Sequence, residues 1–509
     1  MPARGSVSRR AGVVRATGRI LAVVLPLVAV VFVLPGRNWH ESIAVAALLI
    51  PIWVASIAVG RALSGPSLRA LGPEVAICRG VLIAVVASTA VSLLLPGAEL
   101  SAAAIWLIAL TVFLVAAAWE ALALRKFSPA VRVLLVGEVA EAQTLLQDLS
   151  SDVRYELIGV VVDDAELGGE ADPQTLLRGR LAQLSSVIGE QQPDLVVLSD
   201  GRMTPATISG LLDAAEAGFR VLGLAEFYEY AFGRVPIDDL SHDWFMSVLH
   251  LYQRRYSSAV KRGLDVVGAS LLMILTLPLY PLLAMFVLQT DGPLIFKQTR
   301  LGEHGKLFTI YKFRTMRADA EAVVGAVWSS ADDPRLTRAG AVMRKLRLDE
   351  LPQLWNVLRG EMSLVGPRPE RPEFMEELSD RVPFWTRRHL IKPGLTGWAQ
   401  VRLGYTATAE ETATKLSYDL WYLRHRSLTV DLAILLRTLA VVVHGEVWAA
   451  SNAPATAAGD SDAEPLSRPS AAFGSGSARV VPIPVTRLGD DTRRPAELEA
   501  SSGVGGSGY

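Results

Sequence analysis

Four long apolar stretches fill the first quarter of this 509-residue chain, and they constrain its fold more than any other feature. Each is close to the roughly 20 residues that a helix needs to cross the hydrocarbon core of a bilayer. The first is short, but no cleavage site of small residues follows it and three more stretches come after, which argues against a signal peptide. We therefore expect four transmembrane helices, at residues 20–34, 43–59, 75–95 and 102–124.

The positive residues between these stretches predict an orientation. Five arginines precede the first stretch, Arg61, Arg69 and Arg79 surround the second loop, and Arg125 and Lys126 follow the fourth stretch. Loops rich in Lys and Arg remain in the cytoplasm. We expect a multi-pass protein of the inner, cytoplasmic membrane, with residues 1–19 and everything after residue 126 on the cytoplasmic face. The formal net charge of −1 gives no indication of a nucleic-acid partner.

Residues 127–255 carry the pattern of a parallel α/β domain. Strand signals at 131–137, 157–162, 195–198 and 220–224 alternate with helical stretches, as in a Rossmann-like sheet. A dinucleotide site would need G-x-G-x-x-G at the first turn. Here Gly137 is followed by Glu138, and the second and third glycines are missing. We therefore expect a structural or regulatory domain rather than a cofactor-binding one.

A fifth apolar run, at residues 264–288, is interrupted by Pro278 and Pro281. Proline inside a helix removes a backbone hydrogen bond and bends the helix. Cations flank both ends of the run, namely Lys261, Arg262, Lys297 and Arg300. Both ends therefore carry the cytoplasmic signature, and we expect a re-entrant helix that enters one leaflet and returns. The alternative is a fifth span, which would place the rest of the chain outside the cell.

Two adjacent carboxylates, Asp349 and Glu350, follow a cluster of cations at Arg344, Lys345 and Arg347. A carboxylate can act as a covalent nucleophile or as a ligand of a hard metal ion. Neighbouring cations offset the repulsion that an incoming phosphate would meet. The dyad therefore indicates phosphate chemistry, although a surface pair without a role is the alternative for such a motif alone.

A second basic segment, Lys312, Arg314 and Arg317, ends an expected β-hairpin within residues 292–316. These cations are close enough in sequence to bind a phosphate or diphosphate together. A surface that faces solvent or lipid headgroups is the alternative.

Residues 261–445 closely resemble the catalytic domain of the bacterial polyprenyl-phosphate sugar-1-phosphate transferases, which begin exopolysaccharide, capsule and O-antigen assembly. The resemblance rests on five ordered motifs: Lys261-Arg262-x-x-Asp265, Tyr311-Lys312-Phe313-Arg314-Thr315-Met316, Leu348-Asp349-Glu350-Leu351-Pro352-Gln353, Leu364-Val365-Gly366-Pro367-Arg368-Pro369 and Pro393-Gly394-Leu395-Thr396-Gly397. The whole chain is similar to the large form of this family, in which four spans and a Rossmann-like domain precede the catalytic part.

The resemblance implies a two-step reaction and a set of site residues. Asp349 would attack the β-phosphate of a UDP-sugar and expel UMP, and undecaprenyl phosphate would then take the sugar phosphate from this aspartyl intermediate. Glu350, with Asp349, would bind Mg²⁺, which neutralises charge on the diphosphate. The candidate substrate-binding residues are Lys312, Arg314, Arg368, Lys392 and Asp419. For Arg368, a structural or headgroup contact is the alternative.

The sequence departs from the family pattern at two places. Leu277 stands where the family usually has serine before the proline of the helix break, and Arg402-Leu403-Gly404 replaces a common Asn-Gly-Arg. The sugar therefore stays open between glucose, galactose and an N-acetylhexosamine. A homodimer is an open possibility. Two other functions remain as alternatives: a nucleotide-sugar-modifying oxidoreductase and a non-catalytic membrane scaffold for polysaccharide assembly.

The expected organisation is membrane α plus α/β. It comprises a cytoplasmic N-terminus at 1–19, a four-helix transmembrane domain at 20–126, a Rossmann-like domain at 127–255, a monotopic α/β catalytic domain with the re-entrant helix at 256–448, and a disordered tail at 449–509. The tail is expected from its richness in Ala, Ser, Gly and Pro. The single cysteine, Cys78, excludes an intrachain disulfide framework.

Overall fold

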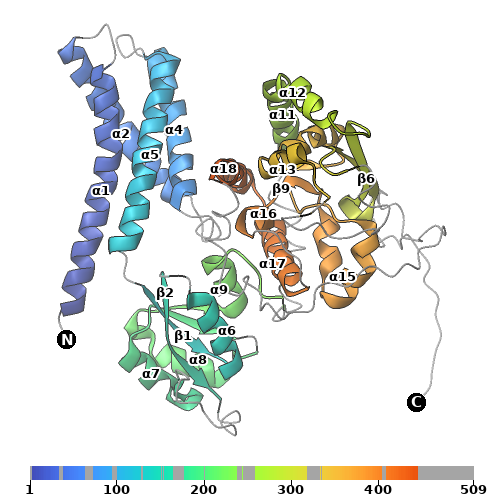
Figure 1. Ribbon diagram of the computed structural model, residues 1–509. Helices are drawn as coiled ribbons and strands as arrows, with labels where there is room; N and C mark the ends of the chain where they lie inside the picture. The colour runs from blue at the N-terminus through green and yellow to red at the C-terminus, as the bar shows by residue number, and fades with distance from the viewer. Residues whose placement is uncertain are drawn as a thin grey trace, which may run out of the picture.

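The computed structural model describes residues 3–33, 38–62, 73–94, 100–127, 130–150, 152, 154–163, 177–199, 201–237, 244, 258–317, 333, 335–403 and 409–444. The expected tail at 449–509 and the expected boundary near residue 256 lie outside these residues. A helical bundle, a parallel-sheet unit and the region that carries the dyad follow one another along the chain (Figure 1).

The bundle consists of α1 (Ala3–Val33), α2 (Trp39–Ala62), α4 (Pro73–Leu94) and α5 (Ala102–Phe127). Each helix contains a segment long and apolar enough to cross a membrane, which confirms the four predicted spans. Gly60 and Gly80 allow α2 and α4 to approach closely, since a Cβ on Gly60 would lie 2.5 Å from the Gly80 nitrogen. Small residues at such crossings are typical of membrane helices. These four helices make the chain a membrane protein.

Polar contacts also join the helices of the bundle. The buried Glu120 of α5 accepts hydrogen bonds from Arg19 Nε of α1 and Arg61 Nη2 of α2, both at 2.6 Å. Trp53 Nε1 of α2 donates to Ser88 Oγ of α4 at 2.9 Å. A buried carboxylate shared by two arginines holds three helices together near one end of the bundle.

The α/β unit is a five-stranded parallel sheet in the order β3-β2-β1-β4-β5. Its strands are β1 (Val131–Val136), β2 (Tyr155–Val162), β3 (Leu177–Arg180), β4 (Leu195–Leu198) and β5 (Arg220–Gly223). The parallel α/β prediction is confirmed. Strand β3 was not predicted, because its sequence Leu-Arg-Gly-Arg lacks an apolar run and lies half exposed at the sheet edge.

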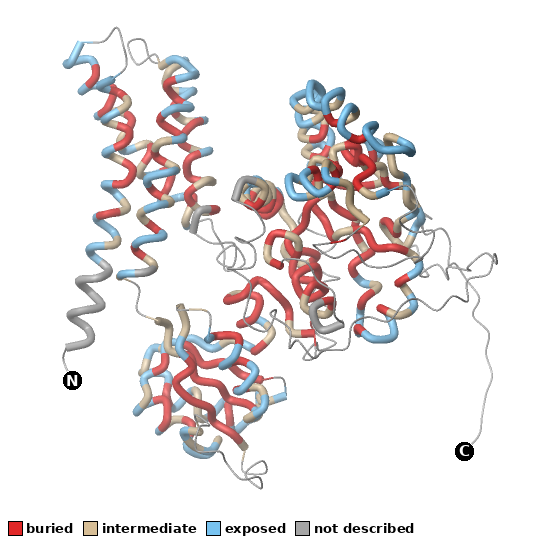
Figure 2. Tube along the Cα trace, in the orientation of Figure 1, coloured by how far each residue is buried: buried red, intermediate tan, exposed pale blue. Residues whose placement is uncertain are grey.

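Helices cover both faces of this sheet. They are α6 (Val139–Ser150), α7 (Leu184–Gln191), α8 (Pro205–Asp213) and α9 (Leu224–Ala231), with short 3₁₀ turns at Leu181–Gln183 and Ala215–Ala217. Val133 and Leu135 of β1 pack on the side of α6 and α9, whereas Leu134 and Val136 pack on the side of α7. Because successive side chains of a strand point to opposite faces, the apolar run of β1 serves two cores. The strands of the sheet are mostly buried, whereas the helices around them are partly exposed (Figure 2).

The dyad region begins with two helices, α11 (Ser258–Thr276) and α12 (Leu279–Val287), which meet at an angle of 69°. The break falls at Leu277 and Pro278, as the proline pattern predicts. A pair bent in this way is either a broken span or a re-entrant loop. The expected hairpin is confirmed as β6 (Ile295–Leu301), antiparallel to β7 (Leu307–Phe313), with a 3₁₀ turn at Glu303–Gly305 between them.

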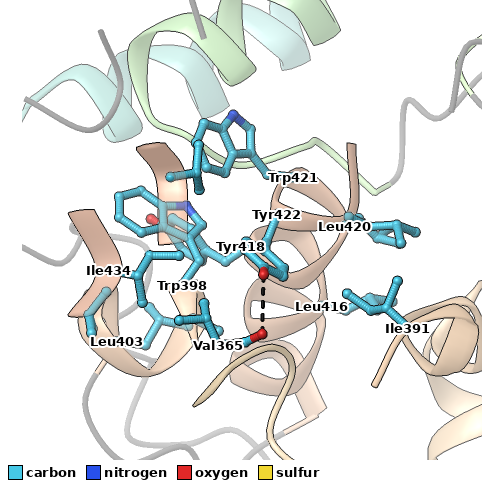
Figure 3. Close-up of a cluster of buried hydrophobic side chains, with 14 of the residues drawn as sticks. Val365, Ile391, Trp398, Leu403, Leu416, Tyr418, Leu420, Trp421, Tyr422 and Ile434 are labelled. Atoms are coloured by element: carbon cyan, nitrogen blue, oxygen red, sulfur yellow. Dashed lines mark hydrogen bonds between the residues drawn. The ribbon is translucent and has the colours of Figure 1, made fainter. Parts of the chain in front are cut away.

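The remaining elements are mostly short. They are α13 (Arg338–Lys345), η5 (Leu348–Gln353), α14 (Leu354–Arg359), β8 (Ser363–Val365), η6 (Pro372–Phe374), α15 (Met375–Arg381), η7 (Trp385–Leu390), β9 (Gly394–Thr396), α16 (Trp398–Arg402), α17 (Ala409–His425) and α18 (Leu428–His444). Strands β8 and β9 pair in parallel. A core rich in aromatic residues, including Trp398, Tyr418 and Trp421, lies between α16, α17 and α18 (Figure 3).

The end of the α/β unit is bonded to this aromatic core. Trp398 Nε1 donates to the Gly233 carbonyl at 2.7 Å, and Val235 N donates to the Ser417 carbonyl at 3.2 Å. Glu229 of α9 is buried and accepts hydrogen bonds from Trp244 Nε1 and from Arg424 of α17. The parallel-sheet unit and the dyad region therefore share a polar and aromatic contact that spans almost 200 residues of sequence.

Candidate active site

The dyad lies in the 3₁₀ helix η5, between α13 and α14. Arg347, which precedes the dyad pair by two residues, has a left-handed backbone with φ of 57°. Such a conformation costs a non-glycine residue about 1–3 kcal/mol and is concentrated at functional sites. Asp349 and Glu350 are each only 6% exposed. A solvated surface pair would not be buried in this way, so the structure disfavours that alternative.

Helix α13 reaches the dyad because Gly340 allows it to touch the end of β7. A Cβ on Gly340 would lie 2.0 Å from the Thr315 carbonyl oxygen. Thr337 caps the helix, since its hydroxyl accepts from Gly340 N at 2.9 Å. Arg344 Nε, one turn later, donates to Thr315 Oγ1 at 3.0 Å. The basic helix and the end of β7 are thereby fixed to each other beside the dyad.

Glu350 is held by two cations from separate elements. Its Oε1 accepts a hydrogen bond from Lys312 Nζ of β7 at 3.0 Å and one from Arg368 Nη2 at 2.8 Å. Burial by itself would raise the pKa of Glu350, but Arg368 and Lys312 outweigh it and hold the pKa well below its usual range. Burial lowers the pKa of Lys312 to about 8, despite the attraction of Glu350. Glu350 therefore remains ionised.

Asp349 has a different environment. Within the described part of the chain, no side chain or backbone group donates a hydrogen bond to its carboxylate. Burial, and then the negative charge of Glu350, raise its pKa; Lys312, Arg344 and Arg368 act in the opposite direction. The two neighbouring carboxylates are therefore inequivalent: Glu350 is bonded and anionic, whereas Asp349 is poorly solvated and accepts no hydrogen bond from the residues that the structure describes.

The structure brings only some of the predicted site residues together. Lys312 and Arg368 meet at Glu350 beside Asp349. Lys392 lies two residues before the start of β9 and is half-buried; in the described residues it makes no hydrogen bond or ion pair with the dyad. The backbone next to Lys392 is bonded to the loop that carries Arg368, because Gly394 N donates to the Pro367 carbonyl at 2.8 Å.

Two predicted substrate ligands have other partners. The Arg314 guanidinium donates to the carbonyls of Val287, Thr290, Asp291 and Pro293, so it closes the turn after α12 rather than facing the dyad. Asp419 is buried on α17 and pairs with Arg388 Nη2 at 2.8 Å. The contact of either side chain with substrate stays a prediction, and in the described structure both contact the protein itself. The reason is that each charge is buried and needs a partner inside the fold.

Glu370, Arg388 and Lys415 form a buried charged cluster, with the half-buried Arg300 beside it, that the sequence did not point to. No motif joins these residues, which come from β6, the loop after β8, η7 and α17. Only the fold brings them together, behind the Arg368 backbone. The lone hint in the sequence was the position of Glu370, two residues after Arg368 in the Pro367-Arg368-Pro369-Glu370 segment.

The carboxylates suit a magnesium ion in number and type. The described residues contain no cluster of three or more His, Cys, Asp and Glu side chains of the kind that would enclose a metal. Mg²⁺ does not need one, since it keeps several waters and binds through one or two carboxylates together with substrate phosphates. The Asp349 oxygens, to which no described residue donates, and the second oxygen of Glu350 are the atoms that could serve.

The α/β unit offers no comparable anion site at its first turn. Glu141 of α6 accepts hydrogen bonds from Glu138 N at 2.9 Å and from Ser199 Oγ at 2.5 Å. A carboxylate of the protein therefore occupies the helix N-terminus where a pyrophosphate would bind. This arrangement disfavours a dinucleotide oxidoreductase.

The segment that carries the dyad is similar to known proteins. Residues 256–445 match the model of the bacterial sugar transferase family. The chain is 39% identical over 236 residues to the UDP-N-acetylgalactosamine-undecaprenyl-phosphate N-acetylgalactosaminephosphotransferase of Aeromonas hydrophila, covering 46% of this chain and 55% of that protein. It is 32% identical to the undecaprenyl-phosphate glucose phosphotransferase of Komagataeibacter xylinus, over 60% of this chain and 58% of that protein. The chain thus spans less than two thirds of these two relatives.

A third relative is covered more fully. The chain is 46% identical over 182 residues to the UDP-glucose:undecaprenyl-phosphate glucose-1-phosphate transferase of Caulobacter vibrioides, which is 35% of this chain and 68% of that protein. All five motifs and the buried dyad lie within, or at the edge of, the segment that matches the family model. The chain therefore belongs to the bacterial sugar transferase family.

Proposed function

We propose that the chain transfers a sugar 1-phosphate from a UDP-sugar to undecaprenyl phosphate and releases UMP. The observation that carries this proposal is the buried pair of inequivalent carboxylates: Glu350 is held by Lys312 and Arg368, and none of the described residues donates a hydrogen bond to Asp349. The printed names of the relatives add the two substrate classes, an undecaprenyl phosphate and a sugar nucleotide. These names include both glucose and N-acetylgalactosamine, so they leave the sugar open.

In the proposed first step, a carboxylate oxygen of Asp349 forms a bond to the β-phosphorus of the UDP-sugar. The bond between this phosphorus and the bridging oxygen breaks, and the oxygen leaves with UMP and the electron pair. In the second step, a phosphate oxygen of undecaprenyl phosphate attacks the same phosphorus and frees the Asp349 carboxylate. Both steps balance without another reactant.

The residues around Asp349 have distinct parts in this scheme. Lys312 and Arg368 hold Glu350 and add positive charge next to the diphosphate. Glu350 and Asp349 would hold Mg²⁺, which neutralises charge on the diphosphate. The burial of Asp349 leaves its oxygens weakly solvated and ready to attack, since no hydrogen bond from the described residues has to be broken first.

We further propose that α11 and α12 form a re-entrant hairpin in the cytoplasmic leaflet, with the dyad on the cytoplasmic face of the inner membrane. The far part of α11 and most of α12 expose large apolar side chains, among them Ile274, Leu277, Leu282 and Met285. An exposed apolar surface of this size marks a membrane or protein contact. The near part of α11 is instead bonded to the fold, since Arg262 donates to the Val357 and Leu358 carbonyls at 2.6 and 2.5 Å.

The activity is tested with the full chain in lipid nanodiscs. Purified protein receives Mg²⁺, undecaprenyl phosphate and one of UDP-glucose, UDP-galactose or their N-acetyl relatives, and UMP release is measured. We expect release with at least one donor and its loss in Asp349→Asn. Asp380→Asn, which changes an exposed carboxylate on α15, serves as the matched control and should keep full activity.

Two outcomes would contradict the proposal. No UMP release with any of the four donors would favour the scaffold alternative. Full activity of Asp349→Asn would remove the nucleophile assignment. Without undecaprenyl phosphate, the wild-type chain should release about one UMP per active site in a burst, because the intermediate then has no acceptor.

The topology has its own test. Cys78 is replaced, single cysteines are placed at Ser258 and Gly292, and intact cells are treated with a membrane-impermeant thiol reagent. We expect neither site to be labelled from outside. Labelling at Gly292 alone would indicate a fifth span instead of a hairpin.

A further inference from the structure

The loop at residues 366–370, which joins β8 to the following 3₁₀ turn, is bonded at each backbone position. Gly366 N donates to the Thr396 carbonyl at 2.9 Å, and the Pro367 carbonyl accepts from Gly394 N at 2.8 Å. The Pro369 carbonyl accepts from Arg300 Nη1 at 3.1 Å, and the Glu370 carbonyl accepts from Leu301 N at 3.0 Å. The backbone of this loop therefore has one strongly determined conformation.

Arg388 supplies the remaining backbone contact of the loop. Its Nη2 donates to the Arg368 carbonyl at 3.0 Å and lies 2.8 Å from Asp419 Oδ2. Its Nη1 donates to Glu370 Oε1 at 3.3 Å. The guanidinium lies over the Trp385 ring at 4.3 Å from the centroid and is fully buried. One side chain thus connects α17 with both ends of the Arg368-Pro369-Glu370 segment.

The charges of this cluster are matched inside the fold. Lys415 Nζ of α17 donates to Glu370 Oε1 at 2.5 Å. Burial alone would raise the pKa of Glu370, but Lys415 and Arg388 outweigh it and hold the pKa far below its usual value. Glu370 is therefore an anion that fixes Arg388 on one side, while Asp419 fixes it on the other.

The Arg368 side chain leaves this fixed backbone in the opposite direction. Its carbonyl faces Arg388, while its guanidinium reaches Glu350 at 2.8 Å and is 34% exposed. Planar guanidinium groups bind carboxylates and phosphates with strict geometry. Small shifts of the Arg368 backbone would therefore change how Arg368 meets Glu350 and the diphosphate.

We propose that Arg388, fixed by Asp419 and Glu370, is a positioning residue that sets the Arg368 guanidinium against Glu350 and the donor diphosphate. The proposal rests on the proposed transferase function. It also gives Asp419 a role different from substrate binding: Asp419 acts through Arg388. The alternative is that the cluster only stabilises the fold.

A double-mutant cycle separates these two roles. Arg388→Lys keeps the charge, but a single ammonium cannot reach the three acceptors that the guanidinium serves. We expect it to lower kcat/KM for UMP release roughly tenfold, the loss expected for one charged hydrogen bond. In an Arg368→Ala background, Arg388→Lys should lower kcat/KM by less than about twofold, because the side chain that Arg388 positions is absent. If Arg388→Lys still lowered kcat/KM tenfold in the Arg368→Ala background, the proposal would be overturned.

Two further variants complete the cycle. Asp419→Asn removes the charge without changing the shape, and it should behave as Arg388→Lys does, which keeps the test usable if the lysine variant does not fold. Arg387→Lys, at the exposed neighbour on the same 3₁₀ helix, should keep full activity. An equal fall of kcat/KM in Arg387→Lys and Arg388→Lys would contradict a specific role for Arg388.

Hydrogen exchange provides a readout that does not depend on activity. In Arg388→Lys, peptides that contain residues 363–372 should exchange at least several-fold faster, while peptides from β7 should keep their rates. Unchanged exchange in the loop would overturn the proposal even if activity fell. If the wild-type chain releases no UMP, the proposed function fails, and this measurement still decides whether Arg388 fixes the loop.

Discussion

Replacing Glu229 with alanine tests the bond between the α/β unit and the aromatic core. Glu229 is buried on α9, and its carboxylate accepts from Trp244 Nε1 at 2.6 Å and Arg424 Nη1 at 2.5 Å. His425 Nε2 lies 2.7 Å from its other oxygen. The side chain of Glu229 is 6% exposed, and those of Arg424 and His425 are 23% and 18% exposed. Alanine would leave three mostly buried donors without their acceptor.

The magnitude follows from this geometry. Removing one member of a buried, hydrogen-bonded ion pair costs about 3–5 kcal/mol, because the other member stays buried without its partner. For a domain of 150–250 residues, each kcal/mol lowers the midpoint of thermal unfolding by about 2–4 °C. We therefore expect Glu229→Ala to lower the midpoint for this part of the chain by about 6–20 °C.

Intrinsic tryptophan fluorescence is a suitable assay, because Trp244, Trp398 and Trp421 surround this contact. The nanodisc protein is heated at one fixed rate, since unfolding of a membrane protein is commonly irreversible. Glu226→Ala, at an exposed glutamate on the same helix, is the matched control and should stay within about 2 °C of wild type. A similarly small shift for Glu229→Ala would refute the claim that the contact stabilises the fold.

Three more changes have defined outcomes. Burial would raise the pKa of Glu229, but His425 and Arg424 outweigh it and lower the pKa below its ordinary 4.5. In the same melting assay, wild type should therefore be more stable than Glu229→Gln by a constant amount above pH 4.5. This difference in stability should shrink as the pH falls further. Gly340→Ala places a Cβ against the Thr315 carbonyl, so it should destabilise the region by about 1–3 kcal/mol and slow UMP release; wild-type rates would show that α13 can move. Lys312→Met should lower the rate of UMP release at least about tenfold, since it removes one of the two cations on Glu350; an unchanged rate would separate Lys312 from the reaction.

The larger features of the fold could be predicted from the sequence because each depends on a local pattern. The four spans follow from runs of apolar residues, and β1, β2, β4 and β5 follow from short runs of Val and Leu. The break at Pro278 follows from the missing backbone donor of proline. Strand β3 escaped prediction because pairing with β2 at the sheet edge, not an apolar run, holds it in place.

The site was predictable only in part. The motifs identified Asp349, Glu350, Lys312 and Arg368, which the structure brings together. The same reasoning assigned Arg314 and Asp419 to the substrate, because a motif reports that a charge is required but not what the charge touches. Arg314 instead binds backbone carbonyls of the turn after α12, and Asp419 pairs with Arg388. Contacts between residues far apart in sequence decide such cases.

The base of α11 links the proposed membrane hairpin to the loop at residues 366–370. Lys261 Nζ donates to the Val365 carbonyl at 3.0 Å and pairs with Asp431 at 2.6 Å, and Asp265 accepts from Leu364 N at 2.9 Å. The Tyr422 hydroxyl lies 3.1 Å from the same Val365 carbonyl (Figure 3).

Val365 is followed directly by Gly366, the first residue of the loop that presents Arg368 to Glu350. In the proposed reaction, an acceptor with its phosphate at the membrane surface would meet a diphosphate held at the dyad, so the depth of the proposed hairpin and the position of Arg368 would have to be set together. Hydrogen bonds from α11 to two consecutive residues of β8 provide such a link. A soluble donor and a membrane-bound acceptor could then meet at Asp349 without a moving domain.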